Sequence, residues 1–514
     1  MTALETVSAI ELRNITKRFG NIVANKGINL SLHYGEILSL LGENGSGKTT
    51  LMNMLAGIYY PDEGEIYING KQVSIRSPKD AYDHKIGMIH QHFKLVDVFT
   101  AAQNIVLGLD GEGRLDMKAI NRKVMEICNK YGFEIDPAMK IYDMSVSQKQ
   151  TVEIIKMLYR GADILILDEP TAVLTPQETT KLFNVLRNMK ADGKAIVIIT
   201  HKLNEVMELS DKVSVLRKGE YIGTVNTGET NPQALTDMMV GHAVTLNINR
   251  PLYENPQPRL CVKGLTCLDN DGVKKLDDVS FTAMGGEILG IAGIAGSGQK
   301  ELLESIAGLY PIESGSILFT PEGREPAELV GKTPMQIKNA GVAMAFVPED
   351  RLGMGLVGSM GMTGNMMLRS WKKGAGVFVN RKEPSELANR IWNDLEVVTP
   401  SVDFPVRRMS GGNVQKVLVG REMSSSPTVM MSAYAVRGLD INTSYTIYNL
   451  MTERKMEGGA VIFVGEDLDV LLELCDRILV LCGGKVSGIV DARTATKEQI
   501  GLMMTSLQGK EDVQ

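Results

Sequence analysis

The sequence lacks an apolar run long enough to cross a membrane. Its longest apolar runs, such as Ile164–Leu167 and Ile196–Ile199, are far shorter than the roughly 20 residues that a membrane-spanning helix needs. Residues Met1–Glu11 show no positively charged segment followed by an apolar stretch, so we expect no secretory signal. If the protein works at a membrane, a partner must hold it there.

Cysteine is also scarce. An odd number of cysteines without CxxC spacing indicates neither a disulfide framework nor a zinc site, and reduced thiols in the cytosol are the simple interpretation. The five cysteines are Cys128, Cys261, Cys267, Cys475 and Cys482.

A basic surplus is absent as well. The formal net charge is −6, whereas a general nucleic-acid binder usually carries excess positive charge or a clear basic face. We therefore expect no nucleic-acid partner. A composition of 44% hydrophobic and 23% charged residues is typical of a soluble globular protein.

What the sequence does contain is an internal repeat. Three blocks recur in the same order: Gly35–Gly42 as Gly286–Gly293 (286 − 35 = 251), Met144–Gln148 as Met409–Asn413 (409 − 144 = 265), and Asp211–Leu216 as Asp476–Leu481 (476 − 211 = 265). A period of this length indicates a duplicated domain rather than a solenoid. We expect a first domain over residues 9–244, a linker over 245–258 with three prolines, and a second domain over 259–507.

Within each copy, apolar runs alternate with helical patterns. In the first copy, Ala162–Leu167 predicts a strand, Gln177–Met189 a helix and Ala195–Ile199 a strand. This alternation predicts an α/β fold with a mainly parallel sheet. Residues from about Val98 to Tyr142 are more helical in pattern and predict a separate lobe.

A phosphate-binding loop follows the strand Ile37–Leu41. It fits G-x-x-x-x-G-K-[ST] between a strand and a helix, the context that this pattern requires. Its glycines let backbone N–H groups turn toward phosphate oxygens, and the helix start adds positive potential. Lys48 is expected to reach the β and γ phosphates and Thr49 to hold Mg²⁺. The residues predicted to bind ATP here are Gly42, Glu43, Asn44, Gly45, Ser46, Gly47, Lys48, Thr49 and Thr50.

A second feature is the apolar run Ile164–Leu167, which ends in two acids. A buried strand ending in Asp168 can place a carboxylate beside the phosphate loop, where it binds Mg²⁺ through water. Glu169 is then placed to polarise the attacking water. Two solvated acids at a strand end are the alternative interpretation, which the intact loop disfavours.

The segments Asp143–Gln150 and Ser410–Lys416 resemble the signature loop of ABC transporter ATPases. Together with Ile86–Phe93 and Leu167–Thr175, the tandem arrangement resembles the ATPases of bacterial sugar and nucleoside importers (the ribose, galactose and basic-membrane-lipoprotein nucleoside groups). The resemblance covers nearly the whole chain. It implies two tandem phosphate-loop NTPase domains, each with a mainly parallel core, an antiparallel β part and a helical lobe.

The resemblance implies further roles. Gln91 matches the glutamine that senses Mg²⁺ and links to the membrane subunits, His201 matches the switch histidine at the γ-phosphate, and Phe19 matches the aromatic residue that stacks on adenine. His90 and His92 flank Gln91, but two histidines without a third ligand are weak evidence for a metal and stay unassigned.

The second copy departs from the pattern at its chemical residues. At offset 251, Lys48 becomes Gln299 and Thr49 becomes Lys300, and a substitute role for Lys300 stays open. At offset 265, Asp168, Glu169 and His201 become Ala433, Tyr434 and Glu466, and the Gln91 position falls near Glu349. We therefore expect an intact first domain and a degenerate second one.

In this family two copies pack head to tail, with ATP between the loop of one and the signature of the other. The resemblance thus implies that Ser410, Gly411 and Gly412 complete the site of the first copy. The altered signature Ser145–Ser147 would face the degenerate loop, with Ser147 where the pattern prefers glycine. Whether that second site holds nucleotide, and whether Tyr434 fills it, stays open.

An ATPase of this kind needs a permease. The resemblance implies two membrane permease subunits, an extracellular substrate-binding protein or lipoprotein, and a peripheral location on the cytoplasmic face of the membrane. The expected docking surfaces are Lys94–Gly108 and Met354–Leu368. The second is rich in methionine, which favours either an adaptable contact surface or packing inside the lobe.

Three functions remain possible from the sequence. The first is an ATPase that drives uptake of a simple sugar or nucleoside, with a slight preference for nucleosides. The second is a soluble ABC-type ATPase that acts on ribosomes or DNA, which the acidic balance and short linker disfavour. The third is a switch with negligible turnover, against which the intact Lys48, Glu169 and His201 argue.

Overall fold

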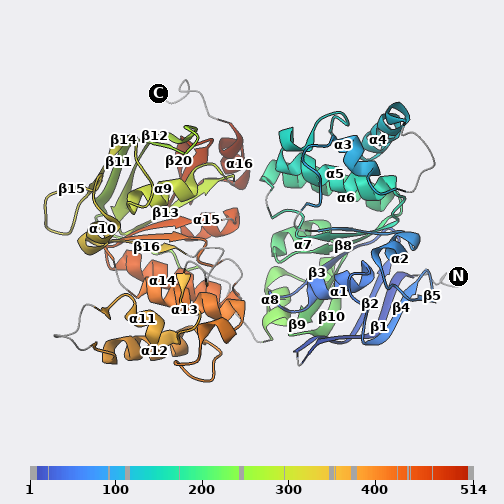
Figure 1. Ribbon diagram of the computed structural model, residues 1–514, viewed down its shortest axis with the longest axis horizontal. Helices are drawn as coiled ribbons and strands as arrows, with labels where there is room; N and C mark the ends of the chain where they lie inside the picture. Colours follow the sequence, from blue (N-terminus) through green and yellow to red (C-terminus); the bar gives the residue numbers. More distant parts are fainter. Residues whose placement is uncertain are drawn as a thin grey trace. The chain divides into compact units, whose positions relative to one another are not determined.

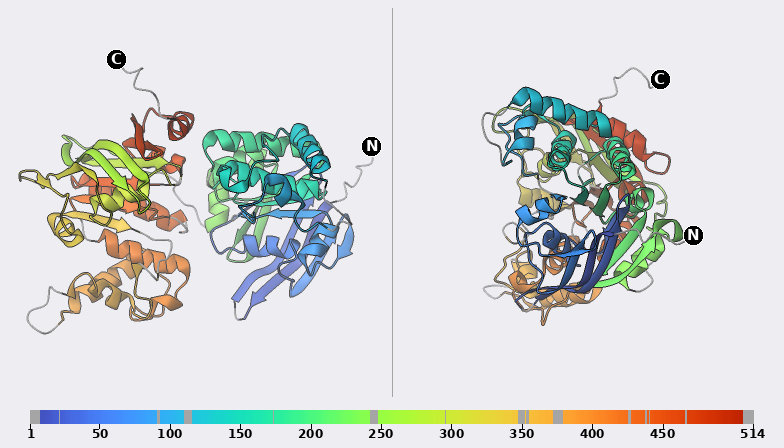
Figure 2. Two further views of the ribbon diagram at one scale, coloured as in Figure 1. Left: turned by 45° about the horizontal axis from the view of Figure 1, so that its top comes forward. Right: turned by 90° about the vertical axis from the view of Figure 1, so that its right-hand side faces the viewer.

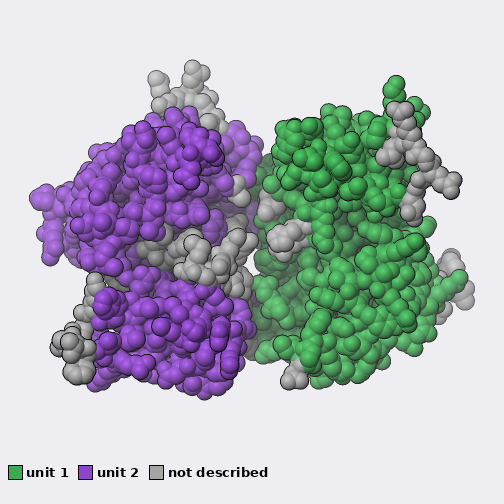
Figure 3. All heavy atoms as spheres, in the orientation of Figure 1, with its two compact units in different colours: residues 1–245 green, residues 246–514 purple. Residues whose placement is uncertain are grey.

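The computed structural model describes residues 8–20, 22–90, 93–109, 116–172, 174–241, 248–294, 296–346, 352, 355–371, 379–424, 427–436, 439, 441–465 and 467–506. The chain forms two compact units, residues 1–245 and 246–514, which Figure 3 colours separately. Both are α/β, as the alternation of strand and helix patterns predicts.

The first unit is built on one ten-stranded sheet in the order β5-β4-β1-β2-β10-β9-β3-β8-β7-β6. The strands β6, β7, β8, β3 and β9 pair in parallel, whereas β1, β2, β4 and β5 pair antiparallel. The strand bounds are β1 Ser8–Phe19, β2 Ile22–His33, β3 Ile37–Leu41, β4 Glu63–Ile68, β5 Lys71–Val73, β6 Ile86–Ile89, β7 Ile164–Asp168, β8 Ala195–Ile199, β9 Lys212–Arg217 and β10 Glu220–Asn226. The expected parallel core and antiparallel part are both confirmed, and the β1–β2 hairpin is dark blue in Figure 2.

The helices of this unit are α1 Lys48–Leu55, α2 Pro78–Asp83, α3 Ala101–Val106, α4 Met117–Tyr131, α5 Val146–Tyr159, α6 Pro176–Ala191, α7 Leu203–Leu209 and α8 Pro232–Val240, with 3₁₀ turns η1 Ile141–Asp143 and η2 Thr227–Glu229. Figure 1 shows α3, α4 and α5 together on one side of the unit, so the predicted helical lobe is present and extends beyond its expected end at Tyr142 to include α5. The sequence of α4 shows why it forms. Asp116 caps its first turn, Gly132 ends it at φ 86°, and its buried residues recur at helical spacing.

The second unit repeats this plan with a four-stranded sheet, β12-β11-β14-β15, and a six-stranded sheet, β16-β17-β18-β13-β19-β20. Its strands are β11 Gln257–Leu268, β12 Lys274–Gly285, β13 Glu287–Gly293, β14 Ser314–Phe319, β15 Ala327–Glu328, β16 Val342–Phe346, β17 Val429–Ala433, β18 Ala460–Val464, β19 Arg477–Cys482 and β20 Lys485–Asp491. Its helices are α9 Gln299–Ile306, α10 Pro334–Ala340, α11 Met362–Met367, α12 Lys382–Asp394, α13 Gly411–Met423, α14 Ile441–Met456, α15 Leu468–Leu474 and α16 Lys497–Thr505, with the 3₁₀ turn η5 Val406–Arg408.

The two units share the register of their central strands. In the first unit β3 lies between β8 and β9, with Leu40 opposite Ile199. In the second unit β13 lies between β18 and β19, with Ile291 opposite Val464. The differences 291 − 40 = 251 and 464 − 199 = 265 are the offsets read from the sequence. The repeat is therefore structural.

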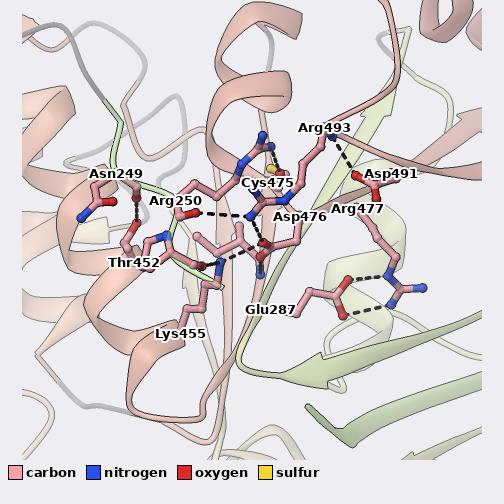
Figure 4. Close-up of polar contacts among 12 residues, drawn as sticks. Asn249, Arg250, Glu287, Thr452, Lys455, Cys475, Asp476, Arg477, Asp491 and Arg493 are labelled. Atoms are coloured by element: carbon pink, nitrogen blue, oxygen red, sulfur yellow. Dashed lines mark hydrogen bonds and ion pairs between the residues drawn. The ribbon is translucent and has the colours of Figure 1, made fainter. Parts of the chain in front are cut away.

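The segment Ile248–Tyr253, expected to be an extended linker, is anchored on the second unit. Ile248 lies buried in that unit's core. Arg250 Nη1 donates to the carbonyls of Leu472 and Cys475, at the end of α15, and Arg493 donates to the carbonyl of Arg250 (Figure 4). A Cβ at Gly286 would lie 2.0 Å from the Tyr253 ring, so only glycine leaves room there.

The anchored segment covers an ion pair that both units possess. Lys455 Nζ lies 2.8 Å from Asp476 Oδ1 and donates to the carbonyl of Pro251 (Figure 4). The corresponding pair in the first unit joins Lys190 to Asp211 at 2.5 Å. The Lys455 side chain is 1% exposed and that of Lys190 is 34% exposed. Removing one partner of a buried ion pair leaves the other charge without compensation. Such a removal should therefore cost more stability in the second unit than in the first.

This difference predicts unequal effects of matched substitutions. Lys455→Met leaves the Asp476 carboxylate without its buried cation and should lower the free energy of unfolding by about 3 kcal/mol, whereas Lys190→Met removes an exposed pair and should lower it by about 0–1 kcal/mol. Urea unfolding followed by tryptophan fluorescence reports the second unit, because both tryptophans, Trp371 and Trp392, lie there. Circular dichroism serves for Lys190→Met. Equal losses would contradict the role given to burial.

Candidate active site

The loop Gly42–Lys48 has the backbone that a phosphate cradle requires. Gly45 and Gly47 have φ of 81° and 95°, where residues with a Cβ are strained. A Cβ at Gly42 would meet the Leu216 carbonyl at 2.3 Å and Ser46 Oγ at 2.5 Å, whereas a Cβ at Gly45 would meet nothing within 4 Å. The loop is therefore tightly packed behind and open in front. The helix α1 begins directly after it, at Lys48.

Ser46 and Asn25 lie behind this loop. Ser46 Oγ is buried and has no hydrogen-bond partner in the part of the chain that the structure describes. Asn25 Nδ2 donates to the carbonyl of Gly47 and thereby holds the second glycine of the loop. Sequence reasoning missed Asn25. The available signal was a polar residue at an inward-facing position of β2.

Lys48 lies folded against its own loop. Its Nζ donates to the carbonyls of Gly42 at 2.6 Å and Glu43 at 3.0 Å. Burial lowers the pKa of Lys48, and the nearby carboxylates of Glu169 and Asp168 oppose that shift. A buried ammonium that faces an open glycine loop is suited to neutralise an incoming phosphate.

Two of the three predicted Mg²⁺ ligands, Thr49 and Asp168, lie side by side, and the third, Gln91, lies outside the described residues. Thr49 Oγ1 donates to Asp168 Oδ2 at 3.2 Å. Burial raises the pKa of Asp168, because the charged form is disfavoured away from water, and the hydrogen bond from Thr49 opposes that shift. A hydroxyl and a carboxylate are the hard oxygen donors that Mg²⁺ prefers, with the remaining positions left to phosphates and water. No group of three or more His, Cys, Asp or Glu side chains that could hold a metal occurs among the described residues.

Glu169 follows Asp168 and faces His201. His201 Nδ1 lies 2.9 Å from Glu169 Oε1, and this hydrogen bond lowers the pKa of Glu169. Glu169 has φ 46°, in the left-handed region that non-glycine residues rarely adopt. Strain of this kind is maintained only where the surroundings fix it, as its N–H bond to the Ile199 carbonyl does here. The result is an ionised carboxylate held next to a histidine at the strand edge.

Phe19 offers an aromatic surface at the end of β1. It is 42% exposed, and its ring meets that of Tyr59 edge-on at 5.1 Å. Tyr59 follows α1, so it connects Phe19 to the helix that starts at the phosphate loop. Gln91 lies outside the described residues, as does His92. Burial lowers the pKa of His90, which is partly buried and stays unassigned.

The second unit keeps the shape of this loop. Gly296 and Gly298 have φ of 87° and 100°. The Ser297 N–H donates to the Ile294 carbonyl, and the Gly484 N–H donates to the Ser297 carbonyl, as Ser46 and Gly219 do in the first unit. The described backbone of this loop is therefore alike in the two units.

The side chains of the second loop have changed. Gln299 Nε2 donates to the Ile294 carbonyl, the bond that Lys48 makes to Glu43, so an uncharged amide takes the lysine's position. Lys300 Nζ instead lies 3.8 Å from Glu304 Oε1 on the same helix, α9. This ion pair disfavours the idea that Lys300 replaces the missing lysine. Ala433 and Tyr434 occupy the positions of Asp168 and Glu169, and Tyr434 keeps φ 54°. Glu349, Glu466 and Ala295 lie outside the described residues.

The position of the predicted adenine-stacking residue Phe19 has changed too. Thr16 pairs with β4 in the first unit and Thr266 pairs with β14 in the second, so these two threonines are equivalent. Phe19 follows Thr16 by three residues, and Asp269 follows Thr266 by three residues. Asp269 accepts the N–H groups of Asp271 and Val273 and pairs with Lys275 at 3.2 Å. A carboxylate engaged in its own turn cannot stack on a base.

Each signature serine caps the helix that follows it. Ser145 caps α5, and its Oγ lies 3.0 Å from Ser147 Oγ. Ser410 caps α13 and accepts from Asn413, while a Cβ at Gly412 would meet nothing within 4 Å. Ser410, Gly411 and Gly412 lie in the second unit, so their meeting with the first loop stays a prediction. The first unit does bring Lys48, Thr49, Asp168, Glu169 and His201 together.

Comparisons with known proteins give the family. A family model described as ABC transporter matches residues 25–172 and 276–432. The guanosine import ATP-binding protein of Bacillus subtilis is 41% identical over 508 residues, covering 98% of each chain. The nucleoside import ATP-binding protein of Lactococcus lactis is 39% identical over 507 residues, again covering 98% of each. The ribose import ATP-binding protein of Rubrobacter xylanophilus is 38% identical over 495 residues, covering 96% of this chain and 97% of that protein. The chain therefore belongs to the ABC transporter family, as a tandem ATPase of that family.

Proposed function

We propose that this chain hydrolyses ATP to drive uptake of a nucleoside or a simple sugar through partner permeases, and that only its first unit supplies the catalytic side chains. The observation that carries the proposal is the cluster of Lys48, Thr49, Asp168, Glu169 and His201 at one strand edge. The import role rests on the names of relatives that match the whole chain.

Each side chain has a distinct task in hydrolysis. Lys48 leaves its loop carbonyls to contact the phosphates, where its charge offsets the negative charge that develops in the transition state. Glu169, kept ionised by His201, accepts a proton from the attacking water. His201 holds Glu169 in place and faces the terminal phosphate. Thr49 and Asp168 would hold Mg²⁺, which supplies charge neutralisation at the phosphate oxygens when bound.

The complete site takes its signature from the other unit. Ser410, Gly411 and Gly412 close over the first loop in a head-to-tail pair, and their serine and helix N-terminus face the γ-phosphate. The altered signature Ser145–Ser147 faces the degenerate loop, which retains a phosphate cradle but lacks the lysine, the Mg²⁺ ligand and the catalytic carboxylate. Hydrolysis therefore occurs at one of the two sites.

The enzymatic part is tested at Glu169. Glu169→Gln keeps the shape of the side chain but removes the base, so steady-state ATP turnover by the purified chain should fall by about 100-fold or more. Binding of ATP should persist, because the loop and Lys48 are untouched. A colorimetric phosphate assay measures turnover, and a fluorescent ATP analogue measures binding. Equal turnover in wild type and variant would favour a switch without catalysis.

The asymmetry between units is tested with a matched pair. Lys48→Ala removes the cation from the first loop and should lower turnover by about 100- to 1,000-fold. Gln299→Ala makes the corresponding truncation in the second loop and should leave turnover within about threefold of wild type. Comparable losses from the two substitutions, measured in the same phosphate assay, would refute a single catalytic site.

Matching exposed apolar side chains in the two lobes support the proposed permease contact. At an offset of 261 residues, exposed apolar side chains recur with nearly equal exposure: Val96 and Val357 at 37% and 38%, Phe99 and Met360 at 37% and 38%, and Leu107 and Leu368 at 45% and 41%. Met362 and Met366 are buried, so the methionine-rich run serves partly in packing, and Met354 lies outside the described residues. Repeated exposed apolar residues fit two cytoplasmic segments of permease subunits.

A permease partner would place the chain at the cytoplasmic face of the membrane, with a substrate-binding protein or lipoprotein outside. Among the described residues no helix has the length and apolar character that crossing a bilayer demands. Two of the three relatives are named for nucleoside or guanosine import and the third for ribose import. The proposal therefore includes both nucleosides and simple sugars as cargo. A soluble role on ribosomes or DNA is the alternative function.

Membrane association distinguishes import from that alternative. Val98 is 66% exposed in the first docking surface, and Val98→Asp should reduce co-sedimentation of the chain with membranes that carry its permeases by about tenfold. Leu502→Asp, at an exposed site on α16, is the control and should sediment like wild type. Wild-type chain that stays with ribosomes or DNA and not with such membranes would support the soluble role.

A further inference from the structure

A buried asparagine holds the loop of residues 96–100 in the first unit. This loop lies within the expected docking surface Lys94–Gly108 and is called the docking loop. Asn104 is 0% exposed and lies in α3. Its Oδ1 accepts the N–H of Val96 at 2.7 Å, and its Nδ2 donates to the carbonyls of Val96 at 3.0 Å and Thr100 at 3.1 Å. One side chain thus satisfies both backbone groups of Val96 and fixes the loop that carries the exposed Val98 and Phe99.

The second unit has the same arrangement. Asn365, in α11, is also 0% exposed. Its Oδ1 accepts the N–H of Val357 at 2.8 Å, and its Nδ2 donates to the carbonyls of Val357 at 3.2 Å and Gly361 at 3.0 Å. The three positions share one offset, because 357 − 96, 361 − 100 and 365 − 104 all equal 261. We call this arrangement, a buried asparagine that bonds both backbone groups of one loop residue, the clamp. The clamp is thus kept in a unit that lacks the catalytic side chains proposed for the first unit.

Each clamped loop is bonded directly to the turn before a signature helix. In the first unit the N–H groups of Ile141 and Tyr142 donate to the carbonyls of Phe99 and Asp97. Ile141 and Tyr142 form η1, which ends two residues before the helix cap Ser145. The exposed loop therefore reaches the signature through two backbone hydrogen bonds and one short turn.

The second unit again repeats the connection. Val406 N–H donates to the Met360 carbonyl and Arg407 N–H to the Gly358 carbonyl, both at 3.0 Å. These residues form η5, which ends two residues before the cap Ser410. In each unit, backbone hydrogen bonds thus join the clamped loop to the 3₁₀ turn, and a single residue of chain, Met144 or Met409, separates that turn from the helix cap.

We infer that Asn104 and Asn365 are positioning residues that make each docking loop and its signature cap move as one rigid lever, and that Asn365 is the one that couples permease contact to ATP hydrolysis. The second half of this inference rests on the proposed function, in which Ser410 and its neighbours complete the only catalytic site. Asn104 holds the corresponding lever of the first unit, which ends at Ser145. In the proposed function that signature faces the loop without a catalytic base, so Asn104 should contribute little to coupling.

The two asparagines form a matched pair for a coupling experiment. The chain is reconstituted with its permeases in lipid nanodiscs, and the stimulation of ATP turnover by the loaded substrate-binding protein is measured. Asn365→Ala should lower that stimulation by about tenfold, whereas Asn104→Ala should lower it by no more than about twofold. Equal losses from the two variants, or no loss from Asn365→Ala, would overturn the assignment of coupling to Asn365.

Hydrogen exchange tests the lever itself, independently of transport. In the full-length chain without permeases, Asn365→Ala should speed amide exchange in residues 357–361 and 406–407 and leave residues 96–100 and 141–142 as in wild type. Asn104→Ala should give the reverse pattern. Faster exchange throughout a unit, or in the loop without the turn, would refute a rigid lever. If Asn365→Ala does not fold, Asn365→Ser, which keeps a small polar group, is measured instead.

The two experiments also separate failure of this inference from failure of the proposed function. A wild-type chain that no permease stimulates would remove the import role while leaving the exchange pattern as expected. A stimulated wild type with an unaltered exchange pattern in Asn365→Ala would retain import and remove the lever.

Discussion

The structure depends on the parallel pairing of β3, β8 and β7, which brings the carboxyl ends of three strands to one edge of a sheet. With Leu40 opposite Ile199 and Asp168 also opposite Ile199, the loop that begins at Gly42, the acidic pair and His201 must follow their strands at the same level. No side chain has to reach far: Thr49 meets Asp168 at 3.2 Å and Glu169 meets His201 at 2.9 Å. Ligands of open α/β sheets bind at this edge for the same topological reason.

The same constraint explains how the second unit can carry different side chains at these positions and keep its fold. The left-handed glycines, the backbone bond of Ser297 to Ile294 and the left-handed residue after β17 are all set by strand and turn geometry. Gln299 replaces the hydrogen bond of Lys48 to the loop without its charge. Tyr434 still has φ 54°, a conformation that costs a β-carbon-bearing residue free energy and that its own chemistry does not need. The scaffold thus imposes the strain on whichever residue stands there.

Much of this could be predicted from the sequence, because the motifs are local. Strands β3 and β8 have the bounds that their apolar runs predict, and the loop, the acidic pair and the degenerate positions follow from fixed spacing. The contacts that could not be predicted join residues far apart in the sequence. Asn25 supports Gly47 across 22 positions, and Lys455 binds the carbonyl of Pro251 across 204. A proline-rich stretch indicates an extended backbone, but it does not reveal the buried lysine and arginine partners that tie Ile248–Tyr253 to one unit.

The distribution of retained and lost features separates two roles that an ATPase domain usually combines. In the second unit, the positions of Lys48, Asp168 and Glu169 hold Gln299, Ala433 and Tyr434, so the side chains to which the proposed function gives chemical roles are gone. The groups that fix geometry remain, namely the docking loop with its Asn365 clamp, the turn at Val406 and the cap at Ser410. A unit without any role in positioning would not need these hydrogen bonds at the same positions as in the first unit. Their presence in both units is the physical reason for the proposal that the second unit keeps a geometric role although it lacks the side chains of the first unit's site.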